Sequence, residues 1–258
     1  KPSFGAAQIN WGHPLATRLL RYWIMNEGAG RFRDSVSQKM SAEPPDNWIV
    51  GPRGISAGFL VIDNYSDLEV SNAIPVPTQG PFAIAMRYRT STSGIFQSII
   101  GMRDSTAARR CGCHITAAGV FSFHFGGGVA GNIVNFTPAS FVDSSWLMTT
   151  GPKGMEIYQD GKLGQADTAD NPTRTSSTAL FALGVNDDTV GNSGVASWDY
   201  VALYTSQLDA MRALWLHAEP YAFLQPVIRR RWFVPTAAGA PTGGVVTPRS
   251  LGLLGVGA

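Results

Sequence analysis

The 258-residue sequence is poor in charged side chains and contains no long apolar run. Charged residues make up 15% of it, against about a quarter in an average globular protein, and the formal net charge is only +2. A charge this small gives no electrostatic reason to expect a nucleic acid partner. Because no stretch of about 18 apolar residues occurs, we expect no transmembrane helix and no membrane partner. The first 14 residues also lack the apolar core of a signal peptide.

Cysteine is scarce, and its placement argues against two common roles. Cys111 and Cys113 are separated by one residue, which is too close for an unstrained disulfide across one strand. Together with His114 they offer three ligands of the kind that zinc takes, whereas a closed structural site needs four. On a strand, the two cysteines would share one face and His114 would lie on the other. We therefore predict reduced, buried thiols.

Glutamate is scarce as well, and this argues against a glycosidase. Such enzymes place two carboxyl groups about 5–5.5 Å or 6.5–9.5 Å apart on either side of the scissile bond. Among the five glutamates, only Glu69 has an acidic neighbour at strand spacing, Asp67, and a solvated strand face explains that pair. No Gly-x-Ser-x-Gly, P-loop or His-Glu-x-x-His motif is found. We predict no catalytic residues and no enzymatic activity.

Turn residues and short apolar segments are abundant. The chain has 29 glycines and 16 prolines, and clusters of Gly, Pro, Asn and Asp separate segments of strand-like pattern. In residues 82–88, Phe82, Ile84, Met86 and Tyr88 share one face and have small or charged partners opposite. Asp160-Gly161 is the strongest hairpin signal. The predicted strands are 19–25, 58–62, 68–70, 82–88, 98–102, 113–117, 120–125, 146–150, 155–159, 179–184 and 197–204.

One helix is predicted near the end of these strands. Ser206 as N-cap and Asp209 three residues later form a capping-box-like start, and Pro220 ends the helix. An apolar stripe at helical spacing runs between them, formed by Leu208, Met211, Leu214 and Trp215. Many short strands and a single late helix favour an all-β sandwich over alternating βα units.

Five stretches, taken in order, carry a resemblance to one family. They are residues 23–30 with Asp34-Ser35, then 57–65, 82–87, 157–161, and 198–204 followed by 206–216. Together they resemble the laminin G-like, concanavalin A-like jelly roll, over roughly residues 10–220. The resemblance implies an all-β, concanavalin A-like β-sandwich with one short C-terminal helix and extended N- and C-terminal arms.

The two ends of the chain resemble a subset of this family. Residues 9–20 are similar to the start of such domains in phage structural proteins, and residues 220–226, followed by arginines and a small-residue tail, are similar to their end. The resemblance implies an N-terminal arm over 1–18, a jelly roll over 19–220 and an extended tail over 221–258. It further implies localisation in the virion, as a capsid decoration protein or another subunit on the particle surface.

The same resemblance implies two candidate calcium ligands. Related domains often bind calcium through the Asp-Ser loop and an acidic position near the last strand, which correspond here to Asp34 and Asp199. The glycine-rich continuation of that loop is missing, and Lys39 adds a positive charge. The alternative is that Asp34 caps a turn while Asp199 pairs with a backbone amide or an arginine. No other cofactor is expected.

The partners implied are other virion proteins, such as the major capsid protein or further copies of this chain. Aromatic and arginine side chains of the two arms are the expected interface anchors, since these residue types dominate interface energetics. They are Trp11, Arg229, Arg230, Arg231, Trp232 and Phe233. An arginine triplet beside an aromatic also occurs in nucleic-acid patches, but no further motif supports that interpretation.

A glycan is the alternative partner, through a carbohydrate-binding module that adheres to host-surface glycans. Sugar sites in β-sandwiches stack exposed aromatic rings on sugar faces, and exposure cannot be deduced from the sequence. The candidate rings are Trp48, Tyr65, Phe96 and Phe136. The oxygen-rich segment Asn186-Asp187-Asp188 has a simpler explanation, because such turns are common for backbone reasons alone.

Overall fold

The computed structural model describes residues 7–41, 44–51, 54–59, 66–67, 74–77, 80–90, 94, 96–103, 111–126, 133–138, 141, 143–167, 178–186, 189–190 and 196–226. The chain divides into two units, residues 1–227 and 228–258, and all described residues belong to the first. The expected anchors Arg229, Arg230, Arg231, Trp232 and Phe233 lie outside the described residues, as does Tyr65. The proposed boundaries at residues 18 and 220 stay a prediction.

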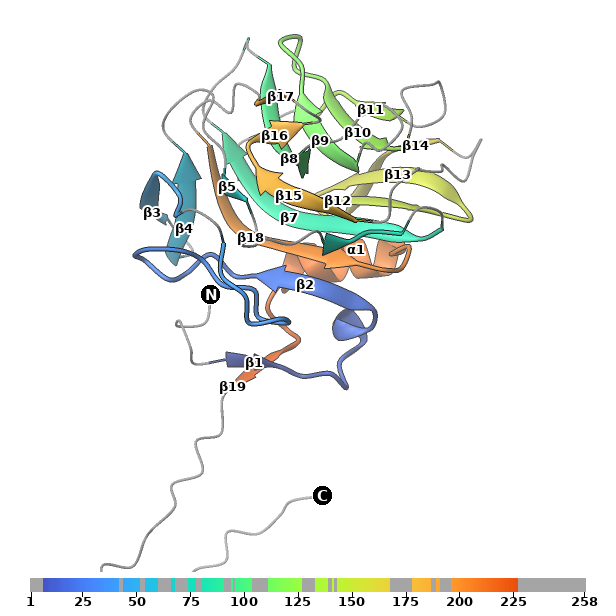
Figure 1. The fold of residues 1–258 in the computed structure, drawn as a ribbon. Helices are drawn as coiled ribbons and strands as arrows, with labels where there is room; N and C mark the ends of the chain where they lie inside the picture. The colour runs from blue at the N-terminus through green and yellow to red at the C-terminus, as the bar shows by residue number, and fades with distance from the viewer. Residues whose placement is uncertain are drawn as a thin grey trace, which may run out of the picture. The chain divides into compact units, whose positions relative to one another are not determined.

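The larger sheet has eight strands within the described ranges, and their pairings are antiparallel (Figure 1). The order is β14-β13-β12-β7-β18-β4-β3, and the long strand β18 also pairs with β2. The bounds are β2 Leu19–Trp23, β3 Asn47–Gly51, β4 Gly54–Phe59, β7 Phe82–Thr90, β12 Ser144–Gly151, β13 Gly154–Gln159, β14 Lys162–Asp167 and β18 Ala196–Tyr204. The hairpin predicted at Asp160-Gly161 joins β13 to β14.

The second sheet has seven described strands, in the order β11-β10-β9-β8-β15-β5, with β6 also paired to β15. Their bounds are β5 Ser66–Asp67, β6 Ile74–Pro75, β8 Gln97–Arg103, β9 Cys111–Ile115, β10 Phe121–Phe125, β11 Ile133–Phe136 and β15 Thr178–Leu183. Two short pairs complete the described strands, namely β16 Val185–Asn186 with β17 Thr189–Val190, and β1 Ala7–Ile9 with β19 Leu224–Pro226.

The two sheets pack face to face over one apolar core. The alternation predicted for residues 82–88 is confirmed, since Phe82, Ile84, Met86 and Tyr88 are all buried in this core. Facing strands contribute aromatic rings, and Phe121 stacks on Trp146 with ring centroids 4.1 Å apart and planes 2° from parallel. The chain is therefore an all-β sandwich of the concanavalin A-like jelly-roll class, as the sequence predicts.

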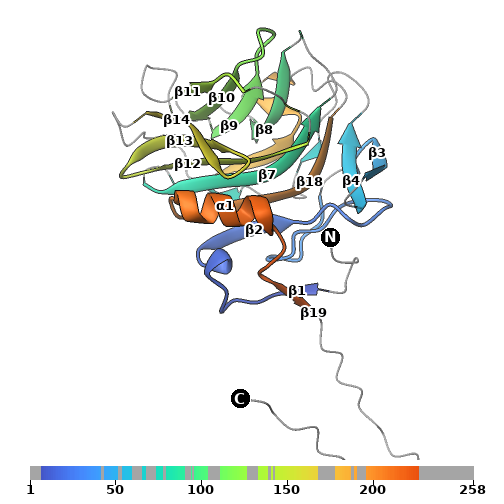
Figure 2. The same cartoon turned by 180° about the vertical axis from the view of Figure 1, so that it is seen from behind.

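A second apolar cluster lies on the outer face of the eight-stranded sheet. Helix α1, Ala210–Ala218, lies across this face (Figure 2), and the short 3₁₀ turn η1, Pro14–Ala16, contributes Leu15 to the same cluster. Ala83 and Ala85 are buried in this cluster, together with Leu208 before the helix and Ala213 and Leu216 on it. The positions opposite the main core thus form a second core instead of a solvated face.

The helix begins later than the sequence predicts. Asp209, not Ser206, is the N-cap, and its carboxylate accepts a hydrogen bond from the Arg212 amide at 2.9 Å. Asp209 has extended backbone angles, as an N-cap residue requires. Within the described ranges, no helix is long and apolar enough to cross a membrane.

Candidate functional site

Three side chains stand side by side across the outer face of the eight-stranded sheet. Strand register pairs Ser145 on β12 with Arg87 on β7, and Arg87 with Tyr200 on β18. Directly opposite residues on neighbouring antiparallel strands have Cβ atoms about 4.5–5.5 Å apart. The C-terminal end of α1 lies beside this row, and Arg87 and residues 217–222 line a hollow of about 590 Å³.

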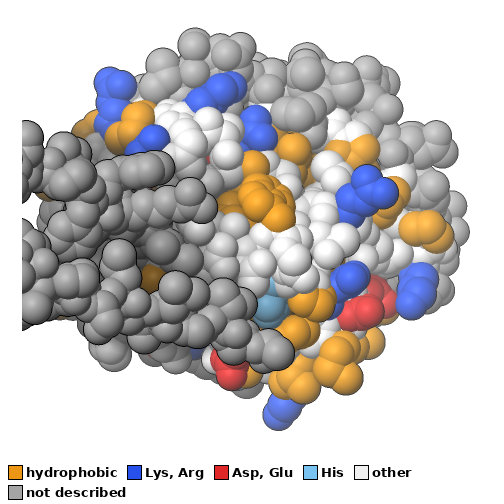
Figure 3. All heavy atoms as spheres, turned by 90° about the horizontal axis from the view of Figure 1, so that it is seen from below, with side chains coloured by type: hydrophobic (Ala, Val, Ile, Leu, Met, Phe, Trp, Pro, Cys, Tyr) orange, Lys and Arg blue, Asp and Glu red, His pale blue; other side chains and the backbone are white. Residues whose placement is uncertain are grey.

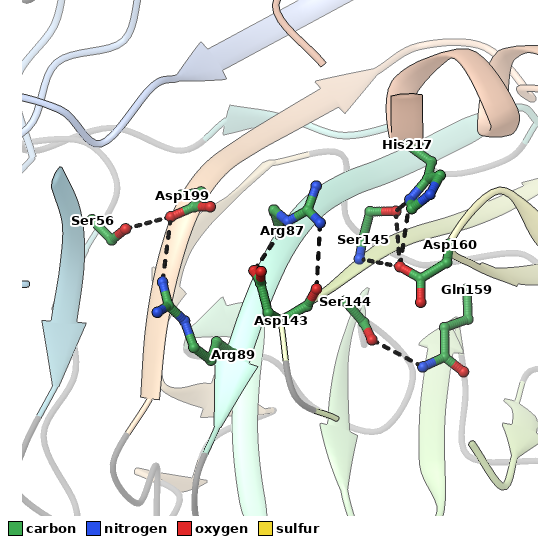
Figure 4. A network of polar contacts seen from close by, with 10 residues as sticks. All are labelled: Ser56, Arg87, Arg89, Asp143, Ser144, Ser145, Gln159, Asp160, Asp199 and His217. Atoms are coloured by element: carbon green, nitrogen blue, oxygen red, sulfur yellow. Dashed lines mark hydrogen bonds and ion pairs between the residues drawn. The ribbon is translucent and has the colours of Figure 1, made fainter. Parts of the chain in front are cut away.

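Arg87 is a buried cation with one ion-pair partner. The residue is 5% exposed, and its Nε donates to Asp143 Oδ1 at 3.1 Å. Its Nη2 donates to the Asp143 carbonyl oxygen at 3.4 Å. In Figure 4 the remaining nitrogen, Nη1, points away from Asp143, and within the described ranges it has no hydrogen-bond partner. Asp143 therefore holds the guanidinium and leaves one edge available in the hollow.

Ser145, Asp160 and His217 meet next to Arg87 (Figure 4). His217 Nδ1 lies 2.9 Å from Ser145 Oγ and 3.5 Å from Asp160 Oδ1, and Asp160 also accepts the Ser145 amide at 2.9 Å. In a catalytic triad, the acid binds Nδ1 and the serine hydroxyl faces Nε2. Here serine and acid share the same ring nitrogen. The arrangement therefore holds the imidazole in place and does not activate the serine.

Both oxygens of Asp34 are used within the protein. Asp34 Oδ1 accepts the backbone amides of Tyr22 and Val36 at 2.8 and 3.0 Å, and Oδ2 accepts that of Ser37 at 2.7 Å. Arg21 Nε lies 3.4 Å from Oδ2. A carboxylate has about four lone-pair sites, and four donors surround this one. The geometry is that of a turn cap, and the calcium hypothesis stays a prediction.

Asp199, the second candidate calcium ligand, lies among protein donors of its own. It accepts a hydrogen bond from the Ser56 hydroxyl, and Arg89 Nη2 lies 3.8 Å from the same oxygen, Oδ1. Figure 4 shows the three side chains close together, with Ser56 on β4, Asp199 on β18 and Arg89 on β7. Among the described residues, no group of three or more His, Cys, Asp or Glu side chains could hold a metal ion.

The cysteines and the candidate sugar-stacking rings are mostly packed against the sheets. Cys111 and Cys113 are buried, free thiols in the main core, and burial raises the pKa of Cys113 well above its ordinary value. On the other face of β9, His114 stacks on Phe96 and lies 3.1 Å from a ring nitrogen of His124. Phe136 packs edge-on against Trp146, and Trp48 donates to the Gly30 carbonyl.

Several apolar side chains are exposed. Trp11 is 59% exposed between β1 and η1, and Met211 and Leu214 on α1 are 70% and 50% exposed. Figure 3 shows hydrophobic side chains in separate places on the face seen from below, with Lys and Arg side chains between them. The exposure of Trp11 is compatible with an anchor, and its role at an interface stays a prediction.

Sequence reasoning missed the group around the hollow. Arg87 was expected only as a charged residue on the outer face of its strand, and Ser145, Asp160 and His217 were not expected to meet. They come from β12, the β13–β14 turn and the end of α1. The one local signal was Asp160, whose hairpin turn was predicted. Its neighbours depend on how α1 packs against the sheet.

Comparisons with known proteins identify the fold only. No protein-family model and no curated protein matches the sequence. Trypanosoma rangeli sialidase superposes with a TM-score of 0.56 at 11% identity, over 80% of this chain and 33% of the sialidase. The binding domain of Paraclostridial Mosquitocidal Protein 1 gives a TM-score of 0.61 at 11% identity, over 81% of this chain and 53% of that one.

A third similar structure is botulinum neurotoxin type C, whose cell entry is described as dependent upon interaction with two ganglioside molecules. Its TM-score is 0.59 at 14% identity, over 79% of this chain and 51% of the neurotoxin chain. This chain thus spans about a third of the sialidase and about half of each toxin chain. At identities this low, the superpositions establish a shared β-sandwich fold and say nothing about function, which has to be argued from the site.

Proposed function

We propose that this chain is a non-catalytic domain that binds a glycan in the hollow beside α1. The observation that carries the proposal is the hollow itself, whose lining includes the buried cation Arg87 and the half-buried aromatic residue Tyr221. Small-molecule sites are concave, with apolar walls and a few placed polar groups, and span roughly 300–1,000 Å³. The volume of about 590 Å³ falls within this range.

The chemistry around the hollow supports binding over catalysis. His217, Ser145 and Asp160 have the wrong mutual geometry for nucleophilic attack, because both oxygens face Nδ1. Glu219 is the one carboxylate among the described lining residues. Two carboxylates beside the hollow have structural partners, with Asp143 on Arg87 and Asp160 on the Ser145 amide. Each side chain holds a neighbour in place.

The similar structures agree with this class of function. One is named as a binding domain, and another is described through interaction with gangliosides, which carry glycans. The sialidase likeness covers only a third of the enzyme, so it supports no transfer of activity to this chain. The direct experiment is to screen the full chain for binding on a glycan array and then to map the site by nuclear magnetic resonance.

A second candidate is a structural subunit of a phage particle, with the major capsid protein or further copies of this chain as partner. The 59% exposure of Trp11 near the N-terminus favours it, because tryptophan is among the residues that dominate the energetics of protein interfaces. The pairing of β1 with β19 also places the N-terminal arm next to residue 226, where the C-terminal segment begins. If this candidate is correct, a chain lacking residues 236–258 will fold but fail to assemble. Normal incorporation of that chain into particles would contradict it.

A further inference from the structure

We propose that the hollow recognises an anionic substituent of its glycan, a carboxylate or a sulfate, through Arg87 Nη1 and His217 Nε2. The proposal rests on the glycan-binding function above and names the chemical group that the site selects. Both side chains line the hollow, and each is held from the opposite side by other residues of the protein.

Arg87 provides the fixed positive charge. Its Nε and Nη2 atoms are engaged by Asp143, so the guanidinium plane is set before a ligand arrives. Nη1 keeps its two N–H donors for the hollow, since no described residue accepts from it. A guanidinium never loses its charge and suits the planar oxygens of carboxylates and sulfates. Burial strengthens the interaction because water screens it less.

His217 provides a second nitrogen donor from the end of α1. Ser145 Oγ and Asp160 Oδ1 both face Nδ1, at 2.9 and 3.5 Å, which fixes the ring orientation. In the neutral tautomer in which Nδ1 accepts a hydrogen bond from the Ser145 hydroxyl, the ring proton is on Nε2, which is then the donor available to a ligand. Nε2 has no hydrogen-bond partner within the described part of the chain. Asp160 and Ser145 are therefore positioning residues for His217, as Asp143 is for Arg87.

The other charges at the hollow limit the ligand to a single anionic group. Asp143 and Asp160 lie behind the two donors, and Glu219 lines the hollow with an exposed side chain. A polyanion such as an acidic peptide or a nucleic acid would place further negative charge against Glu219. The remaining lining, which includes Pro220 and Tyr221, suits the apolar face of a sugar ring. One acidic sugar within a largely neutral glycan fits this distribution best.

The test compares matched ligands and matched variants by nuclear magnetic resonance titration of the full chain. The probes are methyl glucuronide, N-acetylneuraminic acid methyl glycoside and N-acetylglucosamine 6-sulfate, with methyl glucoside as the neutral control and an acidic peptide as competitor. The variants are Arg87→Gln and His217→Gln, with Arg31→Gln as the control because Arg31 is exposed and does not line the hollow. Thermal unfolding checks that each variant is folded. If Arg87→Gln does not fold, the comparison of acidic and neutral probes is made with His217→Gln.

We expect at least one acidic probe to bind more tightly than methyl glucoside and to shift amides of residues 217–222. Its Kd should rise by about 10- to 100-fold in Arg87→Gln, which is the loss typical of a charge-assisted hydrogen bond. It should rise by a smaller factor in His217→Gln and stay unchanged in Arg31→Gln. Comparison of the carboxylate and sulfate probes then decides which anion is preferred.

Three outcomes would overturn the inference. Equal binding of acidic and neutral sugars at the hollow would refute it and leave the glycan-binding function standing. An acidic peptide that binds the hollow more tightly than any sugar would show that the site recognises peptide. Failure of every glycan to bind would refute both proposals together.

Discussion

Gly161 lies directly against the backbone of helix α1 at Leu214. A Cβ atom on Gly161 would stand 2.8 Å from Leu214 Cα, closer than real Cβ contacts allow. Gly161 also has φ +76°, a conformation that favours glycine. The β13–β14 turn that carries Asp160 is thus packed tightly onto the helix that carries His217.

Replacing Gly161 with alanine should therefore destabilise the protein through both conformation and contact. Gly119→Ala is the matched control, because Gly119 has φ +77° and nothing within 4 Å of its Cβ position. We expect Gly161→Ala to lower the free energy of unfolding by about 1–3 kcal/mol more than Gly119→Ala does. Urea unfolding measures both. Equal losses would show that α1 does not rest on the turn as described.

Asp34 should stabilise the loop after β2 through hydrogen bonds. Asp34→Ala removes the acceptor for three backbone amides and leaves Arg21 without this carboxylate. We expect a loss of about 2–4 kcal/mol in the free energy of unfolding, because buried amides lose their partner. Arg31→Ala, at an exposed side chain of the same loop, should change stability by less than about 0.5 kcal/mol.

Calcium tests the other hypothesis for the same residue. If Asp34 is only a turn cap, millimolar calcium should leave the melting temperature of the wild-type chain unchanged. A ligand that binds only the folded state would raise it, by an amount that grows with the logarithm of the ligand concentration above Kd. A calcium-dependent increase that Asp34→Ala or Asp199→Ala abolishes would establish the metal site that the family resemblance implies.

Buried tyrosines should make the protein sensitive to alkali. Burial raises the pKa values of Tyr22, Tyr88 and Tyr204 above their ordinary value of 10.0. The unfolded chain then loses protons at a lower pH than the folded one, so stability is complete below about pH 10 and falls above it. Urea unfolding between pH 8 and pH 11.5 should show this loss, and a flat profile would contradict it.

Tyr204 isolates one contribution to that pH dependence. Within the described part of the chain its hydroxyl is buried without a hydrogen-bond partner. Tyr204→Phe should therefore cost little at pH 7, since no bond is broken, and should reduce the loss of stability above about pH 10. A large loss at pH 7 would mean that the hydroxyl has a partner of structural importance.

The sequence predicted central strands better than edge strands, for a physical reason. Residues 82–88 alternate clearly because β7 packs against the main core on one face and against the second apolar cluster on the other. Three strands that were not predicted, β3, β11 and β14, stand at the ends of their sheets in the observed order. An edge strand has a neighbour on one side only and often carries polar side chains, as Lys162–Asp167 does, so its alternation is weak.

Contacts between distant segments were beyond sequence reasoning. The sequence shows only small or charged side chains opposite the core-facing residues of 82–88. Nothing local indicates that Ala83 and Ala85 are buried with a segment more than a hundred residues later. The same packing brings His217 to Ser145, which lies 72 positions earlier in the chain. The sequence predicts a helix start three residues too early, at Ser206 instead of Asp209. Both are good N-cap residues, and only tertiary packing decides between them.

The central claim is that this chain is a non-catalytic domain that binds a glycan in the hollow at Arg87. The most direct measurement is a glycan array probed with the wild-type chain and with Arg87→Gln, followed by mass analysis of each bound glycan. We predict reproducible binding to a set of related glycans that Arg87→Gln weakens, with every glycan recovered intact. Absence of reproducible binding by the wild-type chain, or recovery of cleaved glycans, would contradict the claim.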